Sequence, residues 1–407
     1  MRNIGQSVKC MMIAVVVGLM SGVASQAAAR PLKVFILAGQ SNMQGWFGVS
    51  TFDSMADHPK TAPILKEMRN ADGTPRVCEK VWISSIGCAG DDTTEQKGKL
   101  TVGFGADRDR FGPEFPFGIY MEKLLDEPIL LIKTSWGGKS LHTDFRPPSA
   151  GPYAWSDFEL TQCKQRGDDL EKNKADKVKA TGVYYSLMIE HVRKVLANIN
   201  RIVPQYDPKQ GYELAGFLWF QGWNDLCADW TYNNQMTPGG YDQYGQLLAQ
   251  FIRDVRKDLS TPKMPFVIGV VGMGGVKEAN KPPMLYFCQA QAAPASRPEF
   301  KGNVVAVQTA PYWDDDLAAL QTRMDRLGSK MNEEAKKDPS LTPEAKDTAL
   351  KKAITENFTP EELKRLKGVS HTWGIHYLGA AKIMGPIGKT FAEAIVKLQT
   401  TQRQEKQ

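Results

Sequence analysis

Short apolar runs alternate along the chain with longer segments in which apolar residues recur at helical spacing. The runs are rich in Val, Ile, Leu and Phe, as expected for strands covered on both faces, and they span residues 34–38, 81–85, 129–134, 216–220, 266–271 and 304–308. The helical segments cover residues 116–125, 178–199, 241–259 and 380–398. Such alternation is typical of βαβ units. We therefore expect an α/β fold, a three-layer α/β/α sandwich around a mainly parallel sheet of about five to six strands.

Two segments do not fit this alternation. Residues 144–176 are rich in Pro, aromatic and charged residues, which predicts a long loop insertion beside the site. Residues 323–368 are dense in Lys and Glu, and Thr342-Pro343 and Thr359-Pro360 each read as an N-cap followed by Pro at the first helical position. This segment is predicted to be a charged helical insertion, and its charge favours a solvated surface hairpin over a lid that gates substrate. We expect a single domain over residues 30–400 that carries both insertions.

The N-terminal segment has the pattern of an export signal. Residues 1–29 contain a basic start, an apolar run at 11–23 and small residues at 27–29, which predicts a cleaved secretory signal peptide. The alternative is a retained membrane anchor, but the apolar run is shorter than the roughly 20 residues that span a bilayer. The protein is thus expected to be secreted or periplasmic, without stable membrane insertion.

Composition narrows the classes of function. The chain has 407 residues, 42% of them hydrophobic and 24% charged, which is ordinary for a globular protein. A formal charge of +6, with no stripe of basic and aromatic residues, gives no reason to expect a nucleic-acid partner.

The cysteines and two suggestive motifs do not point to a metal or cofactor. Without Cys10, an odd number of cysteines remains; Cys78 and Cys88 are close enough in sequence to form a disulfide, and the others read as core thiols. The glycine-rich stretch 270–275 lacks the third glycine of a dinucleotide loop, and residues 314–316 read as a helix cap. We expect no cofactor and no metal.

Four segments carry residues suited to acyl transfer. Ser41 follows the first predicted strand after Gly39, and Gly137-Gly138 follow the third. Asn224 comes shortly after the strand at 216–220, and His376 precedes the last helical segment. Ligands of such sheets bind at the carboxyl ends of the strands, so a hydroxyl, backbone amides, a side-chain amide and an imidazole are expected to meet there.

The amino-acid sequences of two of these segments resemble conserved blocks of a known superfamily. Gly39-Gln40-Ser41-Asn42-Met43 resembles the first conserved block of the SGNH hydrolases, in the form found in the branch of the sialate O-acetylesterases and family 6 carbohydrate esterases. Gly222-Trp223-Asn224-Asp225 is similar to their Gly-x-Asn-Asp block. The resemblance implies a flavodoxin-like SGNH hydrolase fold and a substrate that carries acetyl esters on a sugar or polysaccharide, of the sialate or xylan type.

The resemblance also implies roles for individual residues. Ser41 is the implied nucleophile and His376 its base, while the Ser41 amide, the Gly138 amide and the Asn224 side chain form the implied oxyanion hole, with Gly137 as the alternative to Gly138. Asp225 is expected to orient its neighbours. Candidate substrate contacts are Gln40, Gln221, Trp223, Asp225, Trp136 and His371, and the rings of Trp46, Trp136, Trp223 and Trp230 either stack on sugars or pack in the core.

Two positions depart from the family pattern. Many relatives carry Gln-Gly-Glu where this chain has Trp223 in place of the Glu, and Trp373 occupies the place of the acid in the Asp-x-x-His block. Three readings of the second departure stay open: a Ser–His dyad with a backbone carbonyl holding the imidazole, a carboxylate recruited from elsewhere, or loss of activity. Two further functions stay open with them, namely a catalytically impaired carbohydrate-binding relative and a lipase-like or thioesterase-like hydrolase.

Overall fold

A computed structural model describes residues 30–337, 340–372 and 374–404 of the chain. The predicted signal peptide at 1–29 and Trp373 lie outside the described residues. In the part that is described, no helix combines the length and apolarity that crossing a membrane requires.

A seven-stranded sheet forms the centre of the described chain, with the strand order β4-β3-β6-β1-β7-β8-β9. Six of its strands are parallel and correspond to the six apolar runs; they are β1 (Leu32–Gly39), β3 (Val81–Ile86), β6 (Ile129–Ser135), β7 (Tyr212–Phe220), β8 (Phe266–Val270) and β9 (Val304–Gln308). The predicted mainly parallel α/β sheet is confirmed.

The seventh strand was not predicted. β4 (Gln96–Lys99) pairs antiparallel with β3 at the sheet edge. Its sequence, Gln-Lys-Gly-Lys, has no apolar residue, because one side of an edge strand faces solvent instead of another strand. A separate two-stranded sheet pairs β2 (Phe47–Gly48) with β5 (Arg110–Phe111).

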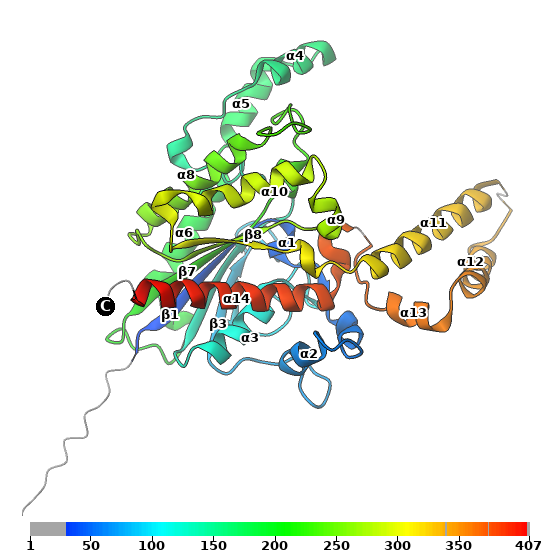
Figure 1. The fold of residues 1–407 in the computed structure, drawn as a ribbon, viewed down its shortest axis with the longest axis horizontal. Coiled ribbons are helices and arrows are strands. Elements are labelled where there is room, and N and C mark those ends of the chain that lie inside the picture. Colours follow the sequence, from blue (N-terminus) through cyan, green and yellow to red (C-terminus); the bar gives the residue numbers. More distant parts are fainter. Residues whose placement is uncertain (1–29, 338–339, 373, 405–407) are drawn as a thin grey trace, which may run out of the picture.

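Helices cover both faces of the sheet (Figure 1). One face carries α3 (Glu114–Leu124) and α14 (Ala381–Gln404), which pack against each other, with α2 (Ala62–Met68) beside them. The other face carries α6 (Val183–Ala197), α8 (Asp242–Asp258) and α10 (Met284–Ala292). Every residue of β1 is buried, so the strand that leads to Ser41 lies in the middle layer of the predicted sandwich.

The remaining helices are short or belong to the insertions. The short ones, α1 (Ser41–Gln44), α7 (Trp223–Leu226) and α9 (Gly275–Ala279), each begin within a few residues of a strand end. The segment predicted as a loop at 144–176 is largely helical instead, with α4 (Asp157–Arg166) and α5 (Leu170–Ala180). Ser156 and Glu159 form a capping box, and Gly167 ends α4 in a left-handed conformation. These local caps specify helices that have little apolar surface.

The second insertion has the predicted helical character. It comprises most of α11 (Asp315–Lys337), then α12 (Pro343–Asn357) and α13 (Pro360–Leu366), and the threonines at 342 and 359 cap the last two helices as expected. Figure 1 shows these helices projecting from the body as an arm. No residue of α12 or α13 is buried.

The five cysteines of the described chain are free thiols. The bridge considered for Cys78 and Cys88 does not form, because the two residues flank opposite ends of β3. A strand of that length separates its ends by about 20 Å, whereas a disulfide needs Cα atoms within about 7 Å.

Candidate active site

The strand register brings three of the predicted segments to one edge of the sheet. Gly39, at the end of β1, pairs with Ser135 on β6 and with Phe220 on β7. Ser41, Gly138 and Asn224 each lie within four residues beyond these three aligned positions. The carboxyl edge of the sheet beside β1 therefore holds the predicted nucleophile and both predicted oxyanion segments.

The turn that carries Ser41 depends on a close approach between two backbones. A Cβ atom built on Gly39 would lie 2.1 Å from the carbonyl oxygen of Phe220, which only glycine avoids. Ser41 is the first residue of the one-turn helix α1, and 8% of the surface of Ser41 is exposed. The packing of β1 against β7 thus fixes the place where the Ser41 side chain emerges.

Hydrogen bonds fix the orientation of the Asn224 side chain. Gln40 Nε2 donates to Asn224 Oδ1 at 2.9 Å, and Asn224 Nδ2 donates to the carbonyl oxygen of Gly138, also at 2.9 Å. Gln40 Oε1 accepts from the backbone amide of Asn224 at 3.2 Å. An amide NH₂ group has two N–H donors, so Asn224 keeps a second donor beside Gly138.

Asp225 is a buried acceptor that joins two of the site segments. Its Oδ2 accepts from the Leu141 amide at 2.7 Å and from Gln221 Nε2 at 2.6 Å. Its Oδ1 accepts from the His142 amide and from the Tyr232 hydroxyl, each at 3.0 Å. Asp225 has no exposed surface, and it anchors the loop that follows Gly138 to the Gln221–Asp225 block.

Most of the predicted substrate contacts are buried among protein groups. Gln40 and Gln221 are each 1% exposed, and Trp136 is 2% exposed with its Nε1 donating to the carbonyl oxygen of Asp92. Trp223 is half-buried against the core. Gln40, Gln221 and Asp225 hold the site segments together and leave little surface for a ligand, whereas Trp136 also lines a cavity.

The segment that carries His376 meets the Ser41 turn. Asn42 Nδ2, one residue after Ser41, donates to the carbonyl oxygen of Ile375 at 3.0 Å. The Trp46 ring stacks on the His376 ring, with centroids 5.2 Å apart and an interplanar angle of 6°. The Ser41 hydroxyl and the His376 ring are not hydrogen bonded to each other within the described structure, although their chain neighbours are in direct contact.

The environment of His376 favours its neutral form. The side chain is buried, and burial lowers its pKa to about 4, with smaller contributions from the neighbouring His371 and Arg110. A neutral imidazole is the form that can accept a proton from a hydroxyl.

The backbone just after His376 adopts an uncommon conformation. Tyr377 and Leu378 have φ of 50° and 60°, in the left-handed region that non-glycine residues rarely enter. The Tyr377 hydroxyl lies 2.6 Å from the Thr309 hydroxyl and accepts from the Gly272 amide at 2.9 Å. This buried tyrosine ties the His376 turn to the ends of β8 and β9, and strain held in this way is common at functional sites.

A buried ion pair lies under the nucleophile turn. Lys133 Nζ, in β6, donates to Glu114 Oε2 and to the Gln44 carbonyl oxygen at 2.8 Å each, and to the Phe104 carbonyl oxygen at 2.7 Å. Both charged side chains have no exposed surface. Burial raises the pKa of Glu114, while the Lys133 ammonium opposes that rise. The sequence analysis did not identify this pair, for which the signal was a lysine inside an apolar strand.

Among the described residues, the side chains of His58, His142 and His191 make no hydrogen bond to the Ser41 turn, whereas His371 is a neighbour of His376. His191 is buried, with Nε2 3.0 Å from the Ser84 hydroxyl, and His142 is buried with Nδ1 2.9 Å from the Thr143 hydroxyl. His58 is exposed. His371 lies beside His376, with ring centroids 4.5 Å apart.

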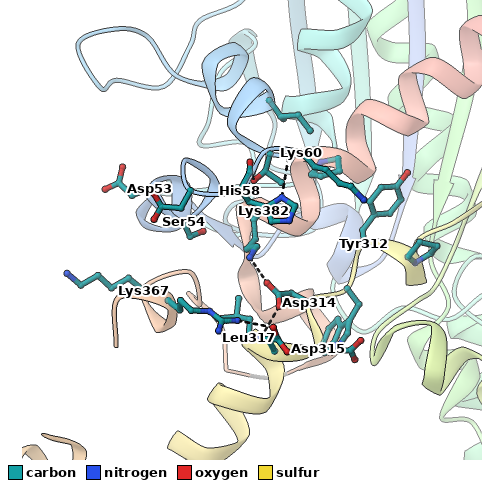
Figure 2. Close-up of a pocket in the computed structure, with 18 of the residues that line it drawn as sticks. Asp53, Ser54, His58, Lys60, Tyr312, Asp314, Asp315, Leu317, Lys367 and Lys382 are labelled. Atoms are coloured by element: carbon teal, nitrogen blue, oxygen red, sulfur yellow. Dashed lines mark hydrogen bonds and ion pairs between the residues drawn. The ribbon is translucent and has the colours of Figure 1, made fainter. Parts of the chain in front are cut away.

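Two cavities lie near these segments. One, of about 760 Å³, lies beside two of the site segments, because Gln44, Trp136, Gly137 and Lys139 line it. The larger, of about 1020 Å³, lies around the ion pair between Asp314 and Lys382 (Figure 2). None of Ser41, Gly138, Asn224 or His376 lines either cavity, but Gly137 and Lys139, the chain neighbours of Gly138, line the smaller one.

One family model matches most of the chain. A model of the family described as "Carbohydrate esterase, sialic acid-specific acetylesterase" matches residues 31–336. This stretch includes Ser41, Gly138 and Asn224 and ends before His376. A search of curated proteins gave no match.

Three solved structures are similar to this chain. A protein from Arabidopsis thaliana is 18% identical, and the match covers 69% of this chain and 86% of that one with a TM-score of 0.35. A carbohydrate acetylesterase from Xanthomonas citri is 15% identical, and the match covers 69% of this chain and 50% of that one with a TM-score of 0.38. NanS is 13% identical, and the match covers 69% of this chain and 78% of that one with a TM-score of 0.40. On the family match over residues 31–336, the chain belongs to the sialic acid-specific acetylesterase family of carbohydrate esterases.

Proposed function

We propose that the protein is an exported serine esterase that removes acetyl groups from O-acetylated carbohydrates, with Ser41 as nucleophile and His376 as base. The observation that carries the proposal is the meeting of four distant segments at one sheet edge, together with the contact of Asn42 with Ile375. Export rests on the sequence pattern at 1–29, and the substrate class rests on family membership.

In the proposed reaction, Ser41 Oγ bonds to the acetyl carbonyl carbon while its proton passes to His376 Nε2. The carbonyl electron pair moves onto oxygen, and this oxyanion accepts hydrogen bonds from the Ser41 amide, the Gly138 amide and the free N–H of Asn224. Collapse breaks the bond to the sugar oxygen, which takes the proton from Nε2. Water, deprotonated by Nε2, then releases acetate and restores Ser41.

We assign the cavity of about 760 Å³ to the sugar. It borders Gly137 and Gln44, so a sugar in it can present an acetyl ester toward the Ser41 turn. Its lining includes Asp91, Arg108 and Lys139, and such polar groups suit a hydroxylated ring.

Hydrolysis of p-nitrophenyl acetate by the purified protein and by Ser41→Ala tests the proposal. We expect the substitution to abolish turnover above the uncatalysed rate, because no other hydroxyl lies in the same turn. Equal rates for the two proteins would refute the esterase and leave a carbohydrate-binding relative. A preference for long acyl esters over acetyl esters would contradict sugar deacetylation, and a mature protein that still begins at Met1 would contradict export.

A further inference from the structure

A histidine that acts as a base needs its second ring nitrogen held. If His376 Nε2 accepts the proton of Ser41, Nδ1 must carry hydrogen, and an acceptor for that hydrogen fixes the correct tautomer and ring orientation. The family pattern supplies an aspartate three residues before the histidine, where this chain has Trp373. The identity of the acceptor in this chain therefore decides how its base works.

The polar neighbour of His376 Nδ1 is His371. Nδ1 lies 3.4 Å from His371 Nδ1 and 3.4 Å from His371 Nε2. The two rings stand nearly perpendicular, at 75°. Among the described residues, no carboxylate and no backbone carbonyl is hydrogen bonded to the His376 ring. Asp314, an acid in a neighbouring loop, is committed to Lys382 at 2.5 Å and to the Leu317 amide at 2.9 Å.

The fold holds His371 in this position through its backbone. The amides of Ser370 and His371 both donate to the carbonyl oxygen of Leu378, at 3.1 and 3.2 Å. The left-handed turn at Tyr377 and Leu378 folds the chain back so that these bonds can form. The Ser370 hydroxyl accepts from the Gly48 amide at 3.0 Å, which ties the pair to β2.

Trp46 orders the two imidazoles relative to each other. Its face stacks on His376, while its ring meets His371 at an angle of 72° with centroids 5.0 Å apart. Arg110 donates to the Trp46 carbonyl oxygen at 2.9 Å and lies over the indole at 5.0 Å. A neutral imidazole carries a ring-nitrogen lone pair that can accept a hydrogen bond.

We propose that His371 is the positioning residue of the base, accepting the Nδ1 hydrogen of His376 in the place where the family has a carboxylate. The inference rests on the proposed function for its catalytic consequence. No proton leaves His376 for His371: the Ser41 proton resides on Nε2 until the sugar oxygen takes it, and His371 only holds the imidazolium that forms meanwhile. A contact of 3.4 Å shortens by a small rotation of the His371 ring, as contacts of catalytic groups commonly do when substrate binds.

The test compares His371→Ala, His371→Gln and His371→Glu, with His58→Ala as a control at an exposed histidine remote from the site. Relative to wild type, we expect Ala to lower kcat for p-nitrophenyl acetate by about 10²- to 10⁴-fold with KM little changed, because the tautomer is no longer held. Gln and Glu have the same shape, but only Glu offers a charged acceptor. Glu is therefore expected to exceed Gln in kcat by at least about tenfold and to move the acid limb of the kcat/KM profile to higher pH.

A purely structural role for His371 would give a different pattern. Gln and Glu would then match Ala in kcat, with no movement of the pH profile, and that result overturns the proposal, as does an Ala variant with kcat within about twofold of wild type. Circular dichroism of each variant separates misfolding from loss of positioning.

A readout independent of turnover separates this proposal from the esterase proposal. The chain has five histidines, so ¹⁵N-histidine NMR can resolve the tautomer of His376 even if Ser41→Ala shows that the protein is not an esterase. We expect hydrogen on Nδ1 in wild type and a mixture of tautomers in His371→Ala. An unchanged tautomer in that variant overturns the role of His371 whatever the activity.

Discussion

Replacing Asp225 by Asn tests whether this buried carboxylate holds the oxyanion segments together. The substitution keeps the shape of the side chain but turns one of two acceptor oxygens into a donor. If the new NH₂ group replaces Oδ1, the Tyr232 hydroxyl can rotate to accept, but the His142 amide loses its acceptor. If it replaces Oδ2, the Leu141 amide loses its acceptor and the new NH₂ group faces the NH₂ group of Gln221. Either way, at least one buried N–H is left unsatisfied.

The expected cost follows from these contacts. An unsatisfied buried N–H costs about 1–3 kcal/mol, and hydrogen bonds to a charged acceptor are stronger than those to a neutral one. We expect Asp225→Asn to lower the free energy of unfolding by about 2–4 kcal/mol in total. Because Leu141 and His142 follow Gly138 closely, a loosened loop misplaces the oxyanion donors, and kcat/KM is expected to fall by about 10- to 100-fold.

Urea unfolding followed by tryptophan fluorescence measures the stability, and hydrolysis of p-nitrophenyl acetate measures the activity. Asp229→Asn is the matched control, since it makes the same chemical change four residues along at an exposed position. An Asp225→Asn protein whose stability stays within about 0.5 kcal/mol of wild type would refute the assignment, because that is the range of ordinary surface substitutions.

Three further outcomes are expected. Asn224→Ala should lower kcat by about 10²- to 10³-fold with little change in KM, since one oxyanion donor is lost; a raised KM with unchanged kcat would speak against that role. Tyr377→Phe should cost about 1–3 kcal/mol in urea unfolding because the buried Gly272 amide loses its acceptor, whereas the exposed Tyr212→Phe should cost almost nothing. The kcat/KM profile should fall only as pH drops toward about 4, where His376 becomes protonated and can no longer accept a proton; an acid limb near 6.5 would contradict its buried setting.

Much of the fold could be predicted from the local pattern of apolar and polar residues. Strands covered on both faces need apolar residues at nearly every position, so the six parallel strands stand out in the sequence. β4 did not, because an edge strand of Gln, Lys and Gly buries little. α4 and α5 were missed for a related reason: their caps specify helices, but their composition has the polar character of a loop.

The sequence by itself determined which residues follow the strand ends, and this is how Ser41, Gly138 and Asn224 could be predicted to meet. The place of each of these residues could be predicted because the carboxyl ends of neighbouring parallel strands meet at one edge of the sheet. The strand register then gave the expected arrangement.

Only the tertiary structure decided what surrounds these residues. Gln40, Gln221 and Asp225 read in the sequence as candidates for contact with substrate, yet their hydrogen-bond partners come from segments about 80 to 180 residues away and bury them. The neighbour of His376 Nδ1 depends on a left-handed turn that returns the chain to His371. The physical reason is that a polar group's partner is fixed by distances across the folded core, which local spacing along the chain does not encode.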